Sequence, residues 1–411
     1  MTTRHDKSAG MVLTLFLLIS LHATAQTSDS LLVEDMRAEG VVFTHNNSVK
    51  LLMSGKEKFA DLFETIRQAK SSIHMEYFNF RNDSIANLLF DLLREKRKEG
   101  VEVRAAFDGF GNDSNNQPLR KEHLKSLRDD GIAIYEFDPI RFPWVNHIWP
   151  RDHRKIVVID GRIGYTGGMN VADYYLVGTE QVGEWRDMHC RIEGSAVNEL
   201  QKIFARFWKK LTKEDLSDPK YYQATDAGDK MVGIATREPN KTNKIMRHFY
   251  ISALDHAKDS IKIVNPYFVP TPSVMKALKR AAERGVKMDI LISSKYDVPL
   301  VPDGVYYNIR KLMKRGANVW RYEPGFHHSK IMMVDGKFCT VGSTNLDARS
   351  LRFDYEINAL IIDRETTREL QDKFIEDTGK CTYLSEEEYQ RTRTRWKRFR
   401  GWFAHLLTAW L

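Results

Sequence analysis

Two segments of the chain carry the same set of chemically active side chains at the same spacing. In each, Lys lies two residues after His, and Asp lies five residues after Lys. A Gly-Gly-x-Asn or Gly-Ser-x-Asn group, where x is any residue, begins seven residues after Asp. The first copy consists of His153, Lys155, Asp160 and Asn170, and the second of His328, Lys330, Asp335, Ser343 and Asn345. Average residue frequencies predict one such match by chance in roughly 10⁵ chains of this length. The pair therefore indicates a repeated functional motif.

Side chains of this kind can hold and activate a phosphoryl group. Residues two apart on a strand project to one face, so the His and Lys of each copy would point together. An imidazole beside an ammonium, with an Asn and a Ser or backbone amides nearby, can stabilise the developing charge without a metal ion. One imidazole can attack phosphorus while a second serves as acid and base near neutral pH. Each copy would supply half of one site.

A catalytic imidazole also needs a partner that fixes its tautomer. Asp187 lies 34 residues after His153, and Glu356 lies 28 residues after His328. Each carboxylate opens an apolar run that is typical of a strand, so both are candidates for orienting the histidines.

The repeated aspartates, Asp160 and Asp335, have two possible roles. They belong to the motif and are candidates for direct participation in catalysis. Each is followed by glycine, however, so closing a tight turn is the favoured role. Zinc is disfavoured because Lys does not ligate it and the histidines form no short-range cluster. We expect neither a metal nor another cofactor.

The elements around the motifs are duplicated as well. Residues 72–78 are typical of a strand, and an amphipathic segment, Gly100 and a second strand follow them. Residues 260–268 begin the same series, in which Gly285 takes the place of Gly100. This alternation predicts α/β units around a sheet. Two homologous halves follow, at residues 40–222 and 231–385, joined by a polar linker. The first half has about ten additional residues ahead of its motif, around 139–149.

Composition and charge narrow the class of protein. Hydrophobic residues make up 42% and charged residues 29% of the 411 residues, which is typical of a globular protein. Three cysteines, Cys190, Cys339 and Cys381, describe no disulfide framework and are expected as small buried side chains. Of the net charge of +8, six charges lie in the last 21 residues, so the body is nearly neutral. A long groove for nucleic acid is therefore disfavoured.

The two ends of the chain suggest contact with a membrane. Residues 1–25 have a basic start, a short apolar run and a small-residue site at Ala25, which predicts a cleaved secretory signal; an uncleaved anchor is the alternative. Residues 391–411 combine six basic residues with large apolar ones at helical spacing. We expect a basic amphipathic helix at the membrane interface, with a helix docked on the body as the alternative.

The paired motifs resemble the phospholipase D superfamily, and in particular the bacterial cardiolipin synthases. Residues 183–187, 265–270 and 346–351 share this narrower resemblance. It implies two homologous phospholipase D-like α/β/α sandwich domains, related by a pseudo-two-fold axis, with the active site between them.

The resemblance also implies a reaction. His153 would attack a phosphatidyl donor to form a phosphatidyl-histidine, while His328 would protonate the departing alcohol and then deprotonate the acceptor. Lys155, Lys330, Asn170 and Asn345 would hold the phosphoryl oxygens, with Ser343 assisting. Two phosphatidylglycerol molecules would give cardiolipin and glycerol.

Three alternatives remain open from the sequence. A phospholipase D would use water as the acceptor and share every earlier step. A nuclease of the same superfamily is disfavoured by the neutral body, and a non-catalytic membrane protein by the retention of both His and both Lys. For the leading hypothesis we expect an exported enzyme that associates peripherally with the periplasmic side of an anionic phospholipid membrane and binds no nucleic acid.

Overall fold

The computed structural model describes residues 27–140 and 149–407. The predicted signal peptide at 1–25, and most of the insertion predicted around 139–149, lie outside these residues. Within the described ranges, no helix is long and apolar enough to cross a membrane.

The described strands form one sheet of 15 strands and a separate pair of short strands. The first half contributes β1 (Phe43–Leu52), β2 (Ser72–Tyr77), β3 (Glu102–Asp108), β4 (Ala133–Phe137), β5 (Ile156–Ile159), β6 (Ile163–Gly167) and β8 (His189–Glu193). The second half contributes β9 (Lys230–Arg237), β10 (Ser260–Val264), β11 (Lys287–Ser293), β12 (Asn318–Tyr322), β14 (Ile331–Val334), β15 (Phe338–Gly342), β16 (Glu356–Ile362) and β17 (Cys381–Tyr383).

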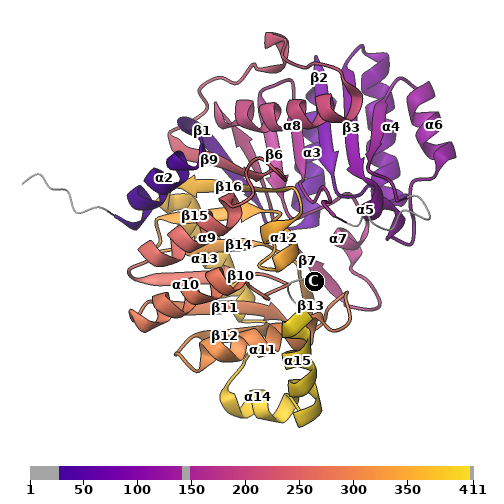
Figure 1. Cartoon of the computed structure of the whole chain (residues 1–411). Coiled ribbons are helices and arrows are strands. Elements are labelled where there is room, and N and C mark those ends of the chain that lie inside the picture. The colour runs from indigo at the N-terminus through magenta and orange to yellow at the C-terminus, as the bar shows by residue number, and fades with distance from the viewer. Residues whose placement is uncertain (1–26, 141–148, 408–411) are drawn as a thin grey trace, which may run out of the picture.

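The strand order shows how the halves are related. It runs β4-β3-β2-β5-β6-β8-β1-β9-β16-β15-β14-β10-β11-β12-β17, so corresponding strands lie at equal distances from the antiparallel β1–β9 pair. This is the order that a two-fold axis between β1 and β9 produces. The predicted duplication is thus confirmed as two α/β halves that share a sheet (Figure 1).

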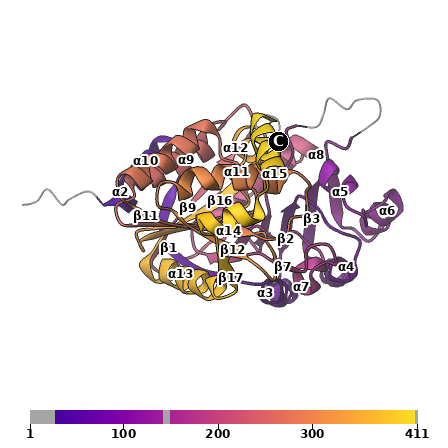
Figure 2. The ribbon, with the colours of Figure 1, turned by 90° about the horizontal axis from the view of Figure 1, so that it is seen from below.

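Helices cover both faces of this sheet. The helices of the first half are α3 (Gly55–Gln68), α4 (Ser84–Lys98), α5 (Gly109–Asp113), α6 (Lys121–Asp129), α7 (Tyr174–Val177) and α8 (Ala196–Thr212). Those of the second are α9 (Ile245–His256), α10 (Pro272–Glu283), α11 (Val301–Met313), α12 (Ala348–Arg352) and α13 (Arg364–Thr378). Figure 2 shows α9, α10 and α11 on one side of the second half and α13 on the other.

Local sequence signals set the ends of the repeated helices. Asp83 caps α4 by accepting a hydrogen bond from the Ala86 amide. Gly100 and Gly285 follow α4 and α10 with φ of 91° and 83°, a conformation that glycine adopts at little cost. The predicted order of strand, helix, glycine and strand is therefore confirmed in both halves as β2-α4-β3 and β10-α10-β11.

One apolar core joins the two halves. It contains side chains of β5 and β8 from the first half and of β14, β15 and β16 from the second. Cys190 and Cys339 lie in this core with no exposed surface, as the sequence predicted. The strands that carry the motifs are consequently held on a shared, closely packed layer.

The first helix crosses to the opposite half. α2 (Ser28–Ala38) precedes the first half in sequence, but Leu32, Val33 and Met36 pack in the core of the second half beside α9. The carboxylate of Asp35 accepts a hydrogen bond from Ser252 Oγ at 2.6 Å. The division of the chain at residue 40 did not anticipate this helix or its position (Figure 1).

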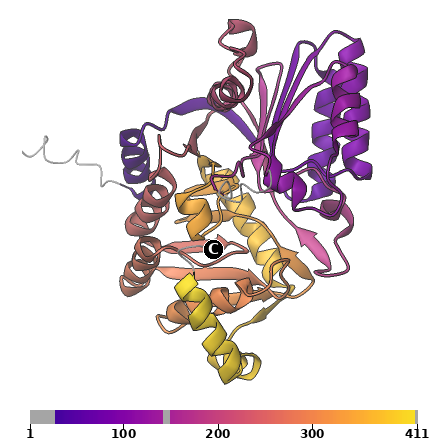
Figure 3. The same cartoon turned by 45° about the vertical axis from the view of Figure 1, so that its right-hand side comes forward.

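The C-terminal segment is a docked helix with an exposed face. After α14 (Glu386–Thr392), α15 (Arg395–Leu407) packs on α11, and Figures 1 and 3 show both helices in yellow at the edge of the second half. Ala404 is buried, whereas Trp396 and Phe399 on the other face are 65% and 51% exposed. The predicted helix is therefore present and is docked on the body, whereas its contact with a membrane stays a prediction.

Candidate active site

The two motif histidines lie just ahead of equivalent strands. His153 and Lys155 precede β5, and His328 and Lys330 precede β14, so the strand predicted over each His-x-Lys begins slightly later. Each lysine forms a hydrogen bond with the backbone of the histidine in its own motif. Lys155 Nζ donates to the His153 carbonyl oxygen at 2.6 Å, and Lys330 Nζ donates to the His328 carbonyl oxygen.

The orienting carboxylates are exchanged between the halves. His153 Nδ1 lies 3.0 Å from Glu356 Oε1, and His328 Nδ1 lies 2.7 Å from Asp187 Oδ2. The sequence placed each carboxylate after the histidine of its own half, and nothing in the motif signalled the exchange. Because the carboxylates engage Nδ1, the Nε2 atom of each ring remains for the substrate.

Backbone contacts build this exchange into the fold. The His153 amide donates to the Tyr355 carbonyl at 3.0 Å, and the His328 amide donates to the Arg186 carbonyl at 2.6 Å. The second contact extends a parallel pair formed by β7 (Glu184–Arg186) and β13 (Gly325–His327). Each histidine is therefore bonded to the residue immediately before its orienting carboxylate.

Burial and neighbouring cations lower the pKa of both imidazoles. Burial, then Lys155 and Lys330, hold the pKa of His153 well below its usual value. Burial and Lys330 lower the pKa of His328 to about 4. Burial likewise lowers the pKa of Lys155 to about 7 and of Lys330 to about 8. A bound anion would favour the charged forms of both lysines.

The two carboxylates differ in their charge state. Burial raises the pKa of Glu356 to about 7, with Lys155 opposing the rise. Burial acts in the same direction on Asp187, but Lys330 and His328 outweigh it and hold its pKa below the usual value. Asp187 is therefore ionised near neutral pH, whereas Glu356 titrates there.

The predicted phosphate-binding residues occupy two kinds of position. Asn170 and Asn345 line the cavity between the halves, and the side-chain oxygen of each is buried without a hydrogen-bond partner. Ser343 does not line it. Its hydroxyl donates to Glu356 and accepts from the Ile357 amide at 3.0 Å. We therefore correct its predicted contact with phosphate to a contact that positions Glu356.

The repeated aspartates lie away from the cavity. Asp160 accepts hydrogen bonds from the backbone amides of residues 70, 71 and 72 at 2.7–3.0 Å. Asp335 accepts equivalent bonds from residues 258, 259 and 260 at 2.8–3.0 Å. Both have φ of 53°, at the ends of β5 and β14 remote from the histidines. This geometry fits the turn-closing role and corrects their inclusion among catalytic candidates.

The cavity between the halves has a volume of about 630 Å³. Both histidines reach it, and much of its wall is aromatic: Phe78, Phe110, Trp149, Tyr174, Trp185 and Tyr267. Such a wall suits a substrate with an apolar part beside its phosphate. In the described part of the chain, no group of three or more His, Cys, Asp or Glu side chains is arranged to hold a metal ion.

Several cavity residues had no role assigned from the sequence. Asp297 accepts a hydrogen bond from the Tyr267 hydroxyl at 2.6 Å. Burial raises the pKa of Asp347 to about 7, and Arg349 donates to Asp354 at 2.6 Å. Asp347 and Arg349 fall within residues 346–351, so the resemblance marked them without a function. Asp297 lies in a segment with no motif.

Comparison with known proteins decides the family. The family model described as cardiolipin synthase, PLD-like domain, matches residues 62–208 and 250–378, one segment in each half of the structure. The chain belongs to the cardiolipin synthase family of phospholipase D-like enzymes.

Relatives in this family match most of the chain. The cardiolipin synthase of Oceanobacillus iheyensis is 36% identical over 357 residues, which cover 87% of this chain and 74% of the relative. Cardiolipin synthase 2 of Staphylococcus epidermidis is 37% identical over 352 residues, covering 85% and 71%. A phosphatidylserine synthase structure from Haemophilus influenzae has a TM-score of 0.68 at 16% identity, and covers 92% of this chain and all of that chain. That likeness shows a shared fold.

Proposed function

We propose that the protein is a phosphatidyltransferase that makes cardiolipin and glycerol from two phosphatidylglycerol molecules through a phosphatidyl-histidine. The observation that carries this proposal is the pair of exchanged contacts, His153 with Glu356 and His328 with Asp187, on one cavity. One neutral and one protonated imidazole on the same cavity supply a nucleophile and an acid for the leaving group, and the negative charge of a bound phosphodiester favours the protonated form of His328. The family named above contains relatives called cardiolipin synthase, which supports this choice.

The first step breaks the bond between phosphorus and the glycerol headgroup. His153 Nε2 attacks phosphorus, and His328 in its protonated form gives its proton to the departing glycerol oxygen. The low pKa of Asp187 supports this division, because an ionised carboxylate stabilises the imidazolium of His328. The depressed pKa of His153 keeps its nitrogen unprotonated for attack.

The second step transfers the phosphatidyl group. His328, now neutral, takes the proton from a hydroxyl of the second phosphatidylglycerol, whose oxygen attacks phosphorus as the bond to His153 Nε2 breaks. Lys155 and Lys330 are not part of the cavity lining, but they lie beside the two histidines, so their charge acts on the phosphoryl oxygens from behind the wall. Asn170 and Asn345 line the cavity and supply amide donors.

We also propose that this reaction takes place at the periplasmic side of a membrane, to which the protein binds peripherally. The support is the exposed aromatic face of α15 and the signal-like sequence at 1–25.

The test is incubation of the purified protein with phosphatidylglycerol vesicles, followed by lipid and glycerol analysis. Equal amounts of cardiolipin and glycerol are expected, with no product from His153→Ala. Phosphatidic acid with glycerol would instead identify a phospholipase D that uses water. Cleavage of nucleic acid with no lipid product would contradict both.

A further inference from the structure

A second cavity lies beside the catalytic one, between α11, α14 and α15. Its volume is about 230 Å³. α11 and α15 separate the two cavities: Asp303 and Gly401 face the smaller one, whereas Gly304 and Ala404 face the catalytic one. The two sites thus share a wall made of two packed helices.

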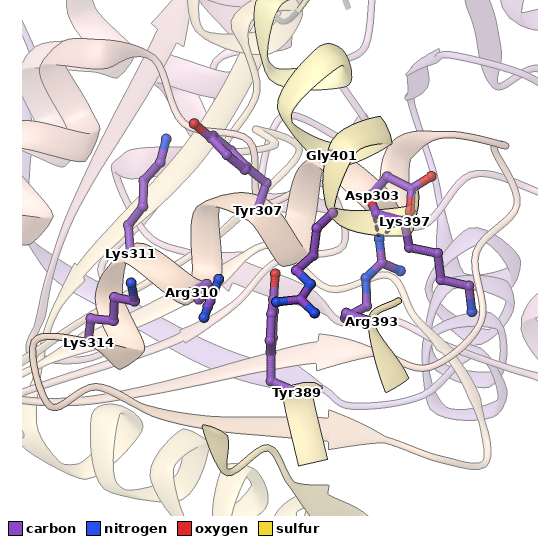
Figure 4. Close-up of a pocket in the computed structure, with 10 residues that line it drawn as sticks. Asp303, Tyr307, Arg310, Lys311, Lys314, Tyr389, Arg393, Lys397 and Gly401 are labelled. Atoms are coloured by element: carbon purple, nitrogen blue, oxygen red, sulfur yellow. Dashed lines mark hydrogen bonds and ion pairs between the residues drawn. The ribbon is translucent and has the colours of Figure 1, made fainter. Parts of the chain in front are cut away.

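The smaller cavity is strongly cationic. Six of its lining side chains are basic: Arg310, Lys311, Lys314, Arg393, Lys397 and Arg398. Two carboxylates offset part of this charge: Asp303 of the lining pairs with Arg393 and Arg400, and Glu386 lies 2.8 Å from Arg310. Figure 4 shows Arg310 and Lys311 on α11 and Lys314 at its C-terminal end, with Arg393 and Lys397 contributed by the C-terminal segment. Like charges held this close favour an anion between them.

Buried donors in this lining lack acceptors. The Nε atoms of Arg310, Arg393 and Arg398 are buried and have no hydrogen-bond partner. Buried donors are normally paired, so three in one cavity point to a missing acceptor. Guanidinium groups match the oxygens of a phosphate in geometry as well as charge.

The position of the cavity identifies the source of the phosphate. Trp396, Phe399, Trp402 and Phe403 of α15 are 45–65% exposed on the same helix that contributes Lys397 and Arg398. Aromatic side chains at such a surface reach the boundary between headgroups and acyl chains, where lipid phosphates lie. The volume is below the 300–1,000 Å³ usual for drug-sized ligands, so it suits a headgroup rather than a whole lipid.

We propose that the pocket between α11, α14 and α15 binds the phosphate of an anionic phospholipid that is not itself a reactant. This inference uses the proposed membrane location and is independent of the proposed reaction. A bound phosphate would hold α15 against α11, where a Cβ at Gly401 would come within 2.6 Å of the Asp303 carbonyl oxygen. An anionic membrane would thereby stabilise one wall of the catalytic cavity.

The test compares two double variants with equal loss of charge. Lys397→Gln/Arg398→Gln removes pocket residues, and Arg391→Gln/Arg395→Gln removes basic residues of the same segment outside the pocket lining. Both are made in the full chain with His153→Ala, so that lipid is not turned over. Sedimentation with phosphatidylcholine vesicles, with and without 20% phosphatidylglycerol, measures binding, and thermal melting checks the fold.

The pocket variant should bind phosphatidylglycerol vesicles about tenfold more weakly than the control variant, while both bind phosphatidylcholine vesicles alike. If both variants lost vesicle binding equally, the total positive charge of the segment would explain the binding, and the proposal would be overturned. The milder Arg398→Lys variant keeps the charge but removes the guanidinium; full binding by it would likewise contradict a shaped phosphate site.

Soluble probes separate a lipid headgroup from free phosphate. Calorimetric titration with monomeric short-chain phosphatidylglycerol should show a pocket-dependent site, and inorganic phosphate should bind there much more weakly. If inorganic phosphate binds equally well, the pocket is a free-phosphate site and the lipid assignment is wrong. Because the His153→Ala background makes no product, a failed cardiolipin assay would leave this binding result intact, and the reverse also holds.

Discussion

The two catalytic candidates act as a unit at the residue scale, because each histidine faces the same cavity and depends on a carboxylate from the other half. We predict that His153→Ala and His328→Ala each lower the turnover rate at least 10²-fold, since loss of an acid or base typically costs 10²–10⁴. The double variant should be little worse than either single one. Initial rates of cardiolipin formation measure this. More than a tenth of the wild-type rate in either variant would contradict a shared site.

The roles of the two histidines can be distinguished by finding which one carries the phosphatidyl group. With a phosphatidyl ester of a good leaving group, His328→Ala should still form the phosphatidyl-histidine but should lack the base for the second step. Acid quenching and peptide mass spectrometry should then find the phosphatidyl group on His153. Modification of His328 in the wild-type enzyme would reverse the assignment.

The pKa of Glu356 predicts the pH dependence. Its value of about 7 means that the carboxyl is protonated below neutral pH and ionised above it. Only the ionised form accepts the Nδ1 hydrogen of His153 and leaves Nε2 free. Since Lys155 and Lys330, with pKa values of about 7 and 8, lose their charge at higher pH, the dependence of kcat/KM on pH should be bell-shaped, and Glu356 should set its rising limb near pH 7. Glu356→Gln should lower the rate and remove this limb. Asp187→Asn should lower the rate but retain the limb, because the pKa of Asp187 is below its usual value.

At the scale of elements, Asp160 and Asp335 close the turns that follow β5 and β14. Replacing Asp160 by Ala leaves backbone amides without their acceptor and puts Ala at a φ of 53°. We predict a loss of about 2–4 kcal/mol in the free energy of unfolding, with kcat of the folded fraction changed less than about threefold. Denaturant melts and kinetics measure both.

Asp160→Asn is the matched control, since Asn keeps an accepting oxygen and tolerates this backbone conformation. It should recover most of the stability. A stable Asp160→Ala protein without activity would restore the catalytic role that the motif suggested.

Local patterns predicted much of the fold, because they depend on residues close in sequence. Apolar runs predicted the strands β5, β14 and β16, and single glycines predicted the ends of α4 and α10. The exchange of Asp187 and Glu356 could not be read in this way. It depends on β7 and β13, two three-residue strands from different halves, whose pairing is a tertiary contact with no periodic signal.

The whole molecule works as one unit because its halves share a core and a site. β1 and β9 pair across the junction, and the apolar side chains of β8 and β16 belong to one cluster. The placement of α2 on the second half adds a further connection that composition and periodicity could not indicate. An isolated half would expose this core and would lack an orienting carboxylate for its histidine.

The outer face of α15 carries exposed aromatic side chains. Trp396 and Phe399 are 65% and 51% exposed and pack on each other with ring centroids 5.6 Å apart. Substitution is a cleaner probe than truncation, because truncation would also remove Ala404 from the cavity wall and Arg393 and Arg400 from Asp303. We predict that Trp396→Ser/Phe399→Ser weakens vesicle binding about 10²-fold, at about 1–2 kcal/mol for each buried aromatic side chain.

The same double variant should melt within about 2 °C of the wild type, because exposed side chains contribute little to folding. Activity on vesicles should fall with binding, whereas activity on detergent-dispersed phosphatidylglycerol should fall much less, since the catalytic residues are elsewhere. Ile375→Ser, an equally exposed apolar residue on α13, is the control and should bind vesicles normally. If the variant instead melts early and loses both activities, the aromatic face supports the fold, and the membrane must bind another surface of the molecule.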